Sequence, residues 1–176
     1  MKRLKLIFCL LCLCCSLTEA KEVQVDAQKE VDEMTGRLVA SYLEAKVDED
    51  VIAGYATALR SDGSFPDLDY ITVHEGSFYP AGSHLKRLKS MAIAYRKPGN
   101  KYYNSGKLLK QIVAGIDYWY KVRPKSGNWW FGDIGAPQDY MVPLILLKGK
   151  ISEKKLLHYS SYLRDLTAVS YTHLTL

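Results

Sequence analysis

Apolar residues recur along most of this chain at intervals of three and four, the spacing that places them on one face of a helix. The clearest stripe runs through residues 26–45 and consists of Val31, Met34, Leu38, Val39, Tyr42 and Leu43. No segment shows the alternation of apolar and polar residues that is typical of a strand. The pattern therefore predicts an all-α protein, with helices over residues 26–45, 51–59, 84–96, 106–122, 137–149 and 153–166.

Short polar residues and helix breakers mark the ends of these segments. Oxygen-bearing side chains that can accept from a first-turn N–H precede four of them, namely Asp48 or Asp50, Ser83, Ser105 and Ser152. Pro137 suits the first turn of the fifth helix, where its missing N–H costs nothing. Consecutive helices of this length, joined by loops, predict antiparallel helical hairpins.

The longest connection, residues 61–82, is unusually aromatic for a loop. It begins with the breakers Asp62-Gly63 and Pro66 and carries four aromatic rings: Phe65, Tyr70, Phe78 and Tyr79. Because rings of this size are costly to leave in water, we expect this loop to pack over the helix ends.

Residues 1–20 have the layout of a secretory signal peptide. A basic start precedes an apolar run of roughly 12 residues, too short to span a bilayer, and a small-x-small site ends at Ala20. Two alternatives stay open: a short membrane anchor, and a lipoprotein signal with Cys14 or Cys15 as the lipidated residue. We therefore expect a secreted or periplasmic bacterial protein, with lipid anchoring as the alternative. All four cysteines lie in this segment, so the mature chain offers no disulfide framework.

The last nine residues, AVSYTHLTL, differ in composition from the residues that precede them. Residues 168–176 carry no charge and no helical period. They also read as the translation of a transposon-end sequencing adapter. We therefore predict three segments: a signal peptide over 1–20, a helical domain over 21–167 and an adapter translation over 168–176. A genuine strand-like tail is the alternative for the last of these.

The charge of the mature chain argues against nucleic acid as its partner. Without residues 1–20, Lys and Arg fall from 24 to 21 and acids from 19 to 18, so the net charge falls from +5 to +3. This mild excess suits a polyanionic ligand. It falls far short of the dense basic stripe of a nucleic-acid binder. We also expect no membrane span in the mature chain.

Motifs for metal, phosphate or nucleophilic chemistry are missing from the sequence. The histidines His74, His84 and His158 stand alone, without a second ligand at helical spacing. His84 is expected to have a structural role. Three loop acids, Asp67, Asp69 and Glu75, could be imagined as a glycosidase pair, but solvated caps are their more ordinary use. The sequence thus predicts no cofactor and no metal site.

The strongest local signal is SGNWWFGDIGAP, residues 126–137, which holds two of the three tryptophans in turn-like surroundings. In a loop both indoles can face one cleft and stack on the C–H faces of sugar rings. Asn128 adds an amide that can bond hydroxyls or a carboxylate. We therefore predict a substrate-binding site made of Asn128, Trp129 and Trp130. The alternative is that one or both rings fill the protein core.

Several stretches, in this order, resemble the N-terminal α/α-toroid domain of polysaccharide lyase family eight, which holds the chondroitin AC, hyaluronate and xanthan lyases. The stretches are LRSDGSFPDLDY, YPAGSHLKRLKSMAIAYRKPGN, YWY and NWWFGDIGAPQDYMVPLILL. The resemblance covers about residues 25–167. The family pattern of Asn-Trp-Trp/Tyr, then Ile-Gly-x-Pro, is matched by Asn128, Trp129, Trp130, Ile134, Gly135 and Pro137. Asp133 stands where the family commonly has Glu, and we assign it no role.

The resemblance implies an incomplete α/α toroid built of antiparallel helical hairpins. It also implies the activity: we expect the chain to be an N-terminal fragment of an exported enzyme that cleaves chondroitin- or hyaluronan-type polysaccharides by β-elimination. That enzyme is expected to act without a cofactor and to be a monomer when full length. In that reaction a Tyr serves as base and acid beside an Asn and a His. The resemblance places these residues in later helices of the toroid, so no catalytic residue is assigned here.

Two other functions remain compatible with the sequence. The chain could be a non-catalytic carbohydrate-binding helical protein whose tryptophan patch is its whole function. It could also be a helical scaffold with the Trp pair in its core, and near-total burial of both rings would favour that reading.

Overall fold

A computed structural model describes residues 27–172 of the chain, with side chains described as far as Arg164. The chain divides into two compact units between Ser41 and Tyr42. Residues 27–43 form the first helix. The remaining elements are α2 (Glu49–Ala58), α3 (Gly82–Arg96), α4 (Gly106–Val122), the π-helical turn η1 (Phe131–Gly135), α5 (Ala136–Leu146) and α6 (Glu153–Thr172). No strand occurs within residues 27–172, which confirms the all-α prediction. The expected signal peptide, residues 1–20, lies outside the described residues.

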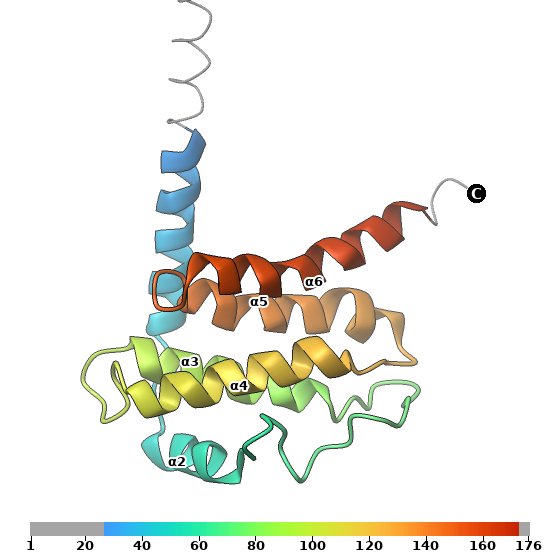
Figure 1. Cartoon of the computed structure of the whole chain (residues 1–176), viewed down its shortest axis with the longest axis horizontal. Helices are drawn as coiled ribbons and strands as arrows, with labels where there is room; N and C mark the ends of the chain where they lie inside the picture. The colour runs from blue at the N-terminus through green and yellow to red at the C-terminus, as the bar shows by residue number, and fades with distance from the viewer. Residues whose placement is uncertain (1–26, 173–176) are drawn as a thin grey trace, which may run out of the picture. The chain divides into compact units, whose positions relative to one another are not determined.

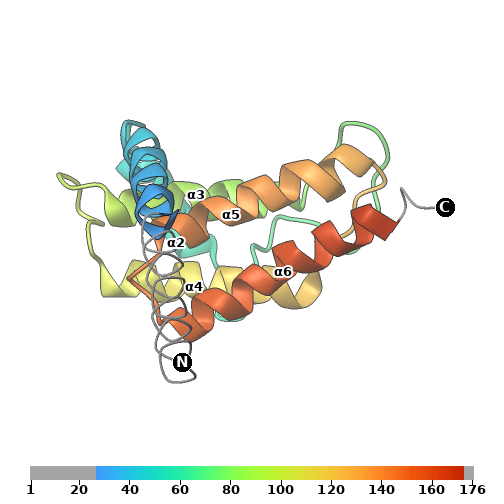
Figure 2. The same cartoon turned by 90° about the horizontal axis from the view of Figure 1, so that it is seen from above.

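The four long helices of the second unit form two antiparallel hairpins, α3 with α4 and α5 with α6 (Figure 1). Seen from above, α3 and α5 lie in one layer and α4 and α6 in the other (Figure 2). Contacts join the helices within each hairpin and also join α3 to α5 and α4 to α6. Two stacked hairpins of this kind are the repeating arrangement of an α/α toroid, as the sequence predicted.

Helix α3 lies at the centre of this packing, because it contacts α2, α4 and α5. Its buried side chains include Leu85, Leu88 and Met91, none of which is exposed to solvent. Helix α4 approaches α3 closely at Gly115, where an added Cβ would lie 2.5 Å from Leu88 Cδ2. The third tryptophan, Trp119, is also fully buried in α4. The core therefore contains one of the three indoles.

Three of the predicted N-caps are confirmed. Asp48 Oδ1 accepts from the N–H groups of Asp50 and Val51 at 3.1 Å, and Ser105 Oγ accepts from Leu108 N–H at 3.3 Å. Ser152 Oγ likewise accepts from Lys155 N–H at 3.4 Å.

The cap predicted at Ser83 is wrong, because α3 already begins at Gly82. There Gly82 N–H donates to Tyr79 O at 3.1 Å and Ser83 N–H donates to Pro80 O at 3.0 Å. These tight turns satisfy the first N–H groups without a side-chain cap.

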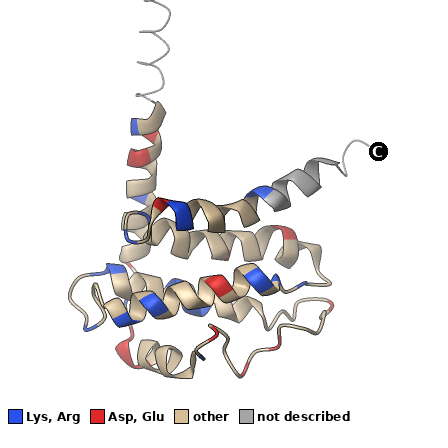
Figure 3. Ribbon diagram, in the orientation of Figure 1, with Lys and Arg blue, Asp and Glu red and all other residues tan. Residues whose placement is uncertain are grey.

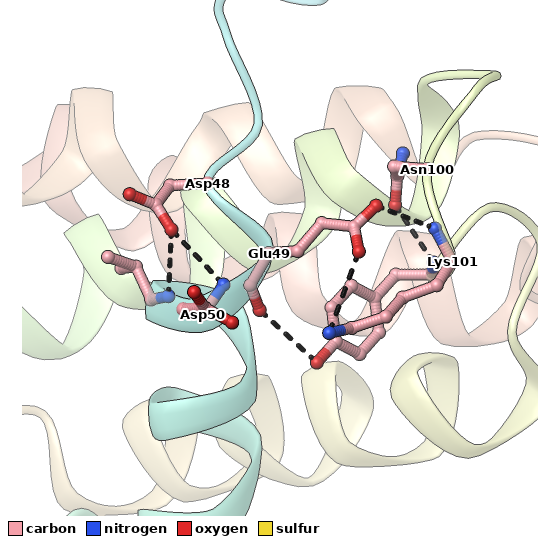
Figure 4. Close-up of polar contacts among 7 residues, drawn as sticks. Asp48, Glu49, Asp50, Asn100 and Lys101 are labelled. Atoms are coloured by element: carbon pink, nitrogen blue, oxygen red, sulfur yellow. Dashed lines mark hydrogen bonds and ion pairs between the residues drawn. The ribbon is translucent and has the colours of Figure 1, made fainter.

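Helix α2 is fixed to the connection between α3 and α4 by a group of polar contacts (Figure 4). Glu49 Oε1 accepts from Lys101 N–H at 3.0 Å, while its Oε2 lies 3.5 Å from Lys101 Nζ. Asn100 Oδ1 accepts from Tyr102 N–H at 2.8 Å, and the Tyr102 hydroxyl donates to Glu49 O at 3.4 Å. The first turn of α2 and the α3–α4 connection thus position each other.

The aromatic loop, residues 61–82, packs against the helices as predicted for three of its four rings. Phe65 is buried, and Tyr70 and Tyr79 are half-buried. The loop is also held by Arg87 of α3, whose guanidinium donates to both carboxylate oxygens of Asp67 at 2.8 and 2.5 Å. For Phe78 the prediction is wrong: its ring is 64% exposed and contacts His74 edge-on.

Helix α6 runs further than the sequence pattern indicated. The periodicity ends near Leu166, whereas the helical backbone continues to Thr172 and so includes five of the nine residues 168–176. The adapter origin of that segment stays a prediction, and residues 173–176 lie outside the described part of the chain. None of the helices described between residues 27 and 172 is long and apolar enough to cross a membrane.

Candidate functional site

The tryptophan pair lies on a helix and not in a loop, which corrects the sequence-based prediction. Trp129 and Trp130 form the first turn of a helical segment that continues through η1 and α5 to Leu146. Asn128 Oδ1 accepts from Trp130 N–H at 2.9 Å and so acts as the cap of this segment. The helix therefore starts eight residues before Pro137, where the sequence placed its first turn.

The π-turn explains how the helix passes Pro137. A proline inside a helix lacks an N–H donor, and its ring crowds the carbonyl four residues earlier. Here the turn from Phe131 to Gly135 is widened, with Ala136 N–H donating to Phe131 O. Placing this turn directly before Pro137 allows the chain to stay helical. Sequence rules that treat a proline as a helix start cannot anticipate it.

Both indoles of the pair are exposed, but they have different surroundings. Adjacent side chains on a helix point about 100° apart, so they do not form one flat surface. Trp129 is 67% exposed. Trp130 is 45% exposed and packs against Phe131, with ring centroids 5.3 Å apart. An added Cβ on Gly135 would lie only 2.8 Å from Trp130 Cζ3. Neither indole is core, in contrast with Trp119.

The segment before the pair is held by the aromatic loop. Gly127 N–H donates to His74 O at 3.1 Å, and the Tyr79 hydroxyl donates to Pro124 O at 2.9 Å. Asn128 Nδ2 donates to Gly76 O at 2.9 Å. Since both ends of the Asn128 amide bond to protein backbone, this side chain chiefly positions the pair. The ligand-binding role predicted for Asn128 stays a prediction.

A groove adjoins the exposed side of Trp130 and has a volume of about 140 Å³. Its aromatic lining comes from Trp130, Phe131 and Tyr79, the last two with ring centroids 5.7 Å apart. Polar side chains from α3 and α5 complete it, namely Lys86, Gln138 and Asp139. Sequence reasoning missed these residues. No local signal marks them, because only the packing of α3 on α5 brings them to Trp130.

Two of the three loop acids considered as a catalytic pair, Asp67 and Asp69, have structural partners. The hydrogen bond from Arg87 holds the pKa of Asp67 below its usual value. Hydrogen bonds from Thr72 and Ile71 hold the pKa of Asp69 well below its usual range. Neither acid has the raised pKa that a general acid requires.

His84 is structural, as predicted, and is fully buried between α3 and α4. Its Nε2 lies 2.9 Å from Gly115 O and its Nδ1 lies 2.9 Å from the Tyr70 hydroxyl. Among residues 27–164, no three His, Cys, Asp or Glu side chains lie together so that they could hold a metal ion.

Comparison with known proteins adds a family to this geometry. Residues 29–172 match the family model described as polysaccharide lyase family 8, N-terminal alpha-helical domain. A chondroitinase-AC from Pedobacter heparinus is 36% identical over a match covering 51% of this chain and 13% of that protein. The hyaluronate lyase HylB from Enterococcus faecalis is 34% identical, over 57% of this chain and 11% of that protein.

Structural comparison agrees with the family match. A solved structure of a chondroitinase AC lyase, studied as enzyme–oligosaccharide complexes, superimposes with a TM-score of 0.64 at 29% sequence identity. The match covers 72% of this chain and 19% of that one. The chain therefore spans roughly an eighth of the length of the two curated relatives.

Proposed function

Because the chain belongs to polysaccharide lyase family 8, within its N-terminal helical domain, we propose that it contributes the sugar-binding surface of an exported lyase. The substrate is an acidic polysaccharide that contains uronic acid, of the chondroitin or hyaluronan type. The observation that carries this proposal is the exposure of both Trp129 and Trp130, the second of which lines a groove. Flat aromatic rings left in water at the rim of a groove are suited to stacking on sugar rings.

The reaction proposed for the whole enzyme is β-elimination at the uronic acid. A base removes the proton from C5, and the C4–O bond to the leaving sugar breaks as the C4–C5 double bond forms. The developing charge on the carboxylate must be stabilised by hydrogen bonds or cations. We assign no catalytic residue within this chain, so its part in the reaction is to bind and orient the polymer.

The charges on the described surface suit a long, flexible polyanion better than a compact one. Lys and Arg are spread over several helices, and α4 carries one acid, Asp117, among its three lysines (Figure 3). Such a mixed surface gives weak, distributed attraction and leaves specific binding to a few side chains. Affinity for the polymer should therefore depend mainly on the indoles.

Replacing either indole with alanine should weaken polysaccharide binding. We expect Trp129→Ala and Trp130→Ala each to lose about 1–3 kcal/mol of binding free energy, by analogy with aromatic stacking on nucleic-acid bases. The free energy of unfolding should fall by less than the roughly 3–5 kcal/mol typical of emptying a buried Trp site. Isothermal titration with chondroitin and hyaluronan, together with urea denaturation, measures both quantities.

The buried Trp119 provides the matched control for these two variants. Trp119→Ala should lower stability by the full amount expected for a core indole, since its ring has no exposed surface. If Trp129→Ala and Trp130→Ala instead behaved like Trp119→Ala, with stability lost and polymer binding intact, the surface proposed here would be a packing element.

The glycine beneath Trp130 allows a test that removes no polar group. Gly135→Ala places a methyl group 2.8 Å from the indole, which has to shift. We expect about a fivefold loss of polysaccharide affinity. Stability should change by less than about 1 kcal/mol, because alanine's better helix propensity offsets the crowding. Gly132→Ala in the same turn, where an added Cβ meets nothing within 4 Å, should leave affinity unchanged. Equal affinities for the two variants would contradict a role for the Trp130 position.

A further inference from the structure

The groove next to Trp130 contains polar side chains that have no hydrogen-bond or ion-pair partner among residues 27–164. Lys86 is one turn along α3 from Gly82, and both line the groove opposite Gln138 and Asp139 of α5. Gly82 packs closely against the Tyr79 ring, since an added Cβ would lie 3.0 Å from it. The groove thus combines the charged and amide groups of α3 and α5 with the aromatic rings described above.

The ammonium group of Lys86, the cation of the groove, has no protein partner among residues 27–164. Lys101 pairs with Glu49, and Lys97 Nζ donates to backbone carbonyls at 2.8 and 3.4 Å. Lys86 Nζ makes no comparable contact in that part of the chain, although Asp139 lines the same groove. The two charges are therefore separate points of attachment and not an ion pair.

From this arrangement we infer a subsite for one anionic sugar residue. This subsite rests on the proposed function. It would bind the sugar residue of the polysaccharide that follows the one stacked on Trp130. Lys86 pairs with the anionic substituent, Asp139 accepts hydrogen bonds from sugar hydroxyls, and the Gln138 amide can do both.

Shape and charge select this class of ligand. The groove, with a volume of about 140 Å³, can hold part of one sugar ring while the rest of the ring stays in solvent. The Asp139 carboxylate disfavours a simple anion such as phosphate, which would meet a negative charge without offering enough donors. A sugar ring that carries both hydroxyls and one anionic group satisfies Lys86 and Asp139 together.

The anion can be a carboxylate or a sulfate, and the choice of polymer separates the two. Unsulfated chondroitin carries only carboxylates, and carboxyl-reduced chondroitin sulfate carries only sulfates. Carboxyl-reduced, desulfated chondroitin carries neither. Affinities of the full chain for these three polymers are measured by isothermal titration at low and moderate salt. Circular dichroism verifies that each variant is folded.

The key variant is Lys86→Gln, with Lys110→Gln as the control that removes an equal charge from an exposed position on α4. Lys86→Gln should lower affinity about three- to tenfold for whichever charged polymer carries the recognised anion. Its binding should also become less sensitive to salt. Affinity for the uncharged polymer should not change. Asp139→Ala should lower affinity for charged and uncharged polymers alike.

Several results would overturn the subsite. The affinity of Lys86→Gln could equal that of Lys110→Gln for every polymer. Lys86→Gln could also lose as much affinity for the uncharged polymer as for the charged ones. A higher affinity of Asp139→Ala for the polyanions would also exclude hydroxyl recognition by Asp139. Loss of binding in Trp130→Ala without loss in Lys86→Gln would reject the subsite and leave the proposed function standing. If the wild-type chain bound none of the polymers, both the subsite and the proposed function would be rejected.

Discussion

Acidification from pH 7 to pH 4 is expected to remove about 3 kcal/mol of folding stability through one side chain, His84. The imidazole is fully buried. It joins a continuous series of hydrogen bonds, in which Phe65 N–H donates to the Tyr70 hydroxyl and that hydroxyl contacts His84 Nδ1, each at 2.9 Å. At its other end Nε2 contacts the backbone carbonyl of Gly115. This arrangement suits the neutral ring, with its proton on Nε2.

The pH window follows from the direction of the pKa shift. Burial lowers the pKa of His84 from 6.5 to about 4, and the nearby charge of Arg87 acts in the same direction. Above pH 6.5 the ring is neutral in both folded and unfolded states, so stability is complete. Between pH 6.5 and about 4 the unfolded state binds a proton that the folded state does not, and stability falls as the pH falls. Below about pH 4 both states are protonated and the loss levels off.

Urea denaturation between pH 7.5 and 4 measures this effect. His84→Gln should lose about 1–3 kcal/mol at pH 7 through imperfect hydrogen bonding, but its stability should vary little with pH over this window. The exposed His158→Gln variant is the control for removing an imidazole from the surface. Asp67 and Asp69, with lowered pKa values, contribute stability that is lost only as the pH falls below their unfolded value of 3.8. An unchanged slope in His84→Gln would show that other groups carry the pH dependence.

How far the sequence predicts this structure depends on the range of the interactions involved. Helix spacing and the caps at Asp48 and Ser105 are local, and the sequence predicted them correctly. The position of the Trp pair was wrong, although the competing signals lie within ten residues. A cap at Asn128 and a π-turn outweighed the start signal of Pro137.

The groove beside Trp130 could not be predicted, because its parts come from distant segments. Lys86 and Gln138 are brought together only when α3 packs on α5. The aromatic loop shows an intermediate case. Its composition indicated burial in general, but whether a given ring is inside depends on local anchors. Tyr70 has a hydrogen-bond partner in His84. Phe78 packs edge-on against His74, and most of its ring stays exposed to solvent.

The aromatic loop begins at a glycine whose replacement should be among the most damaging single changes in the protein. Gly63 has a φ of +90°, in the region that side-chain-bearing residues avoid. An added Cβ would also overlap the backbone carbonyl oxygen of Ala114 in α4, an atom that cannot turn aside. We expect Gly63→Ala to lower the free energy of unfolding by about 3–5 kcal/mol, the sum of backbone strain and overpacking.

Gly99→Ala separates these two causes. Gly99 has a similar φ of +84°, but an added Cβ there meets nothing within 4 Å. It should therefore cost only the backbone strain, about 1–2 kcal/mol. The additional loss in Gly63→Ala measures the close approach of the loop to α4. Because that loop carries Tyr79, which donates to Pro124 just before the Trp pair, Gly63→Ala should also weaken polysaccharide binding while Gly99→Ala does not. Equal denaturation midpoints for the two variants would mean that the loop does not rest on Ala114. Equal polysaccharide affinities would mean that the Trp pair is positioned without the loop.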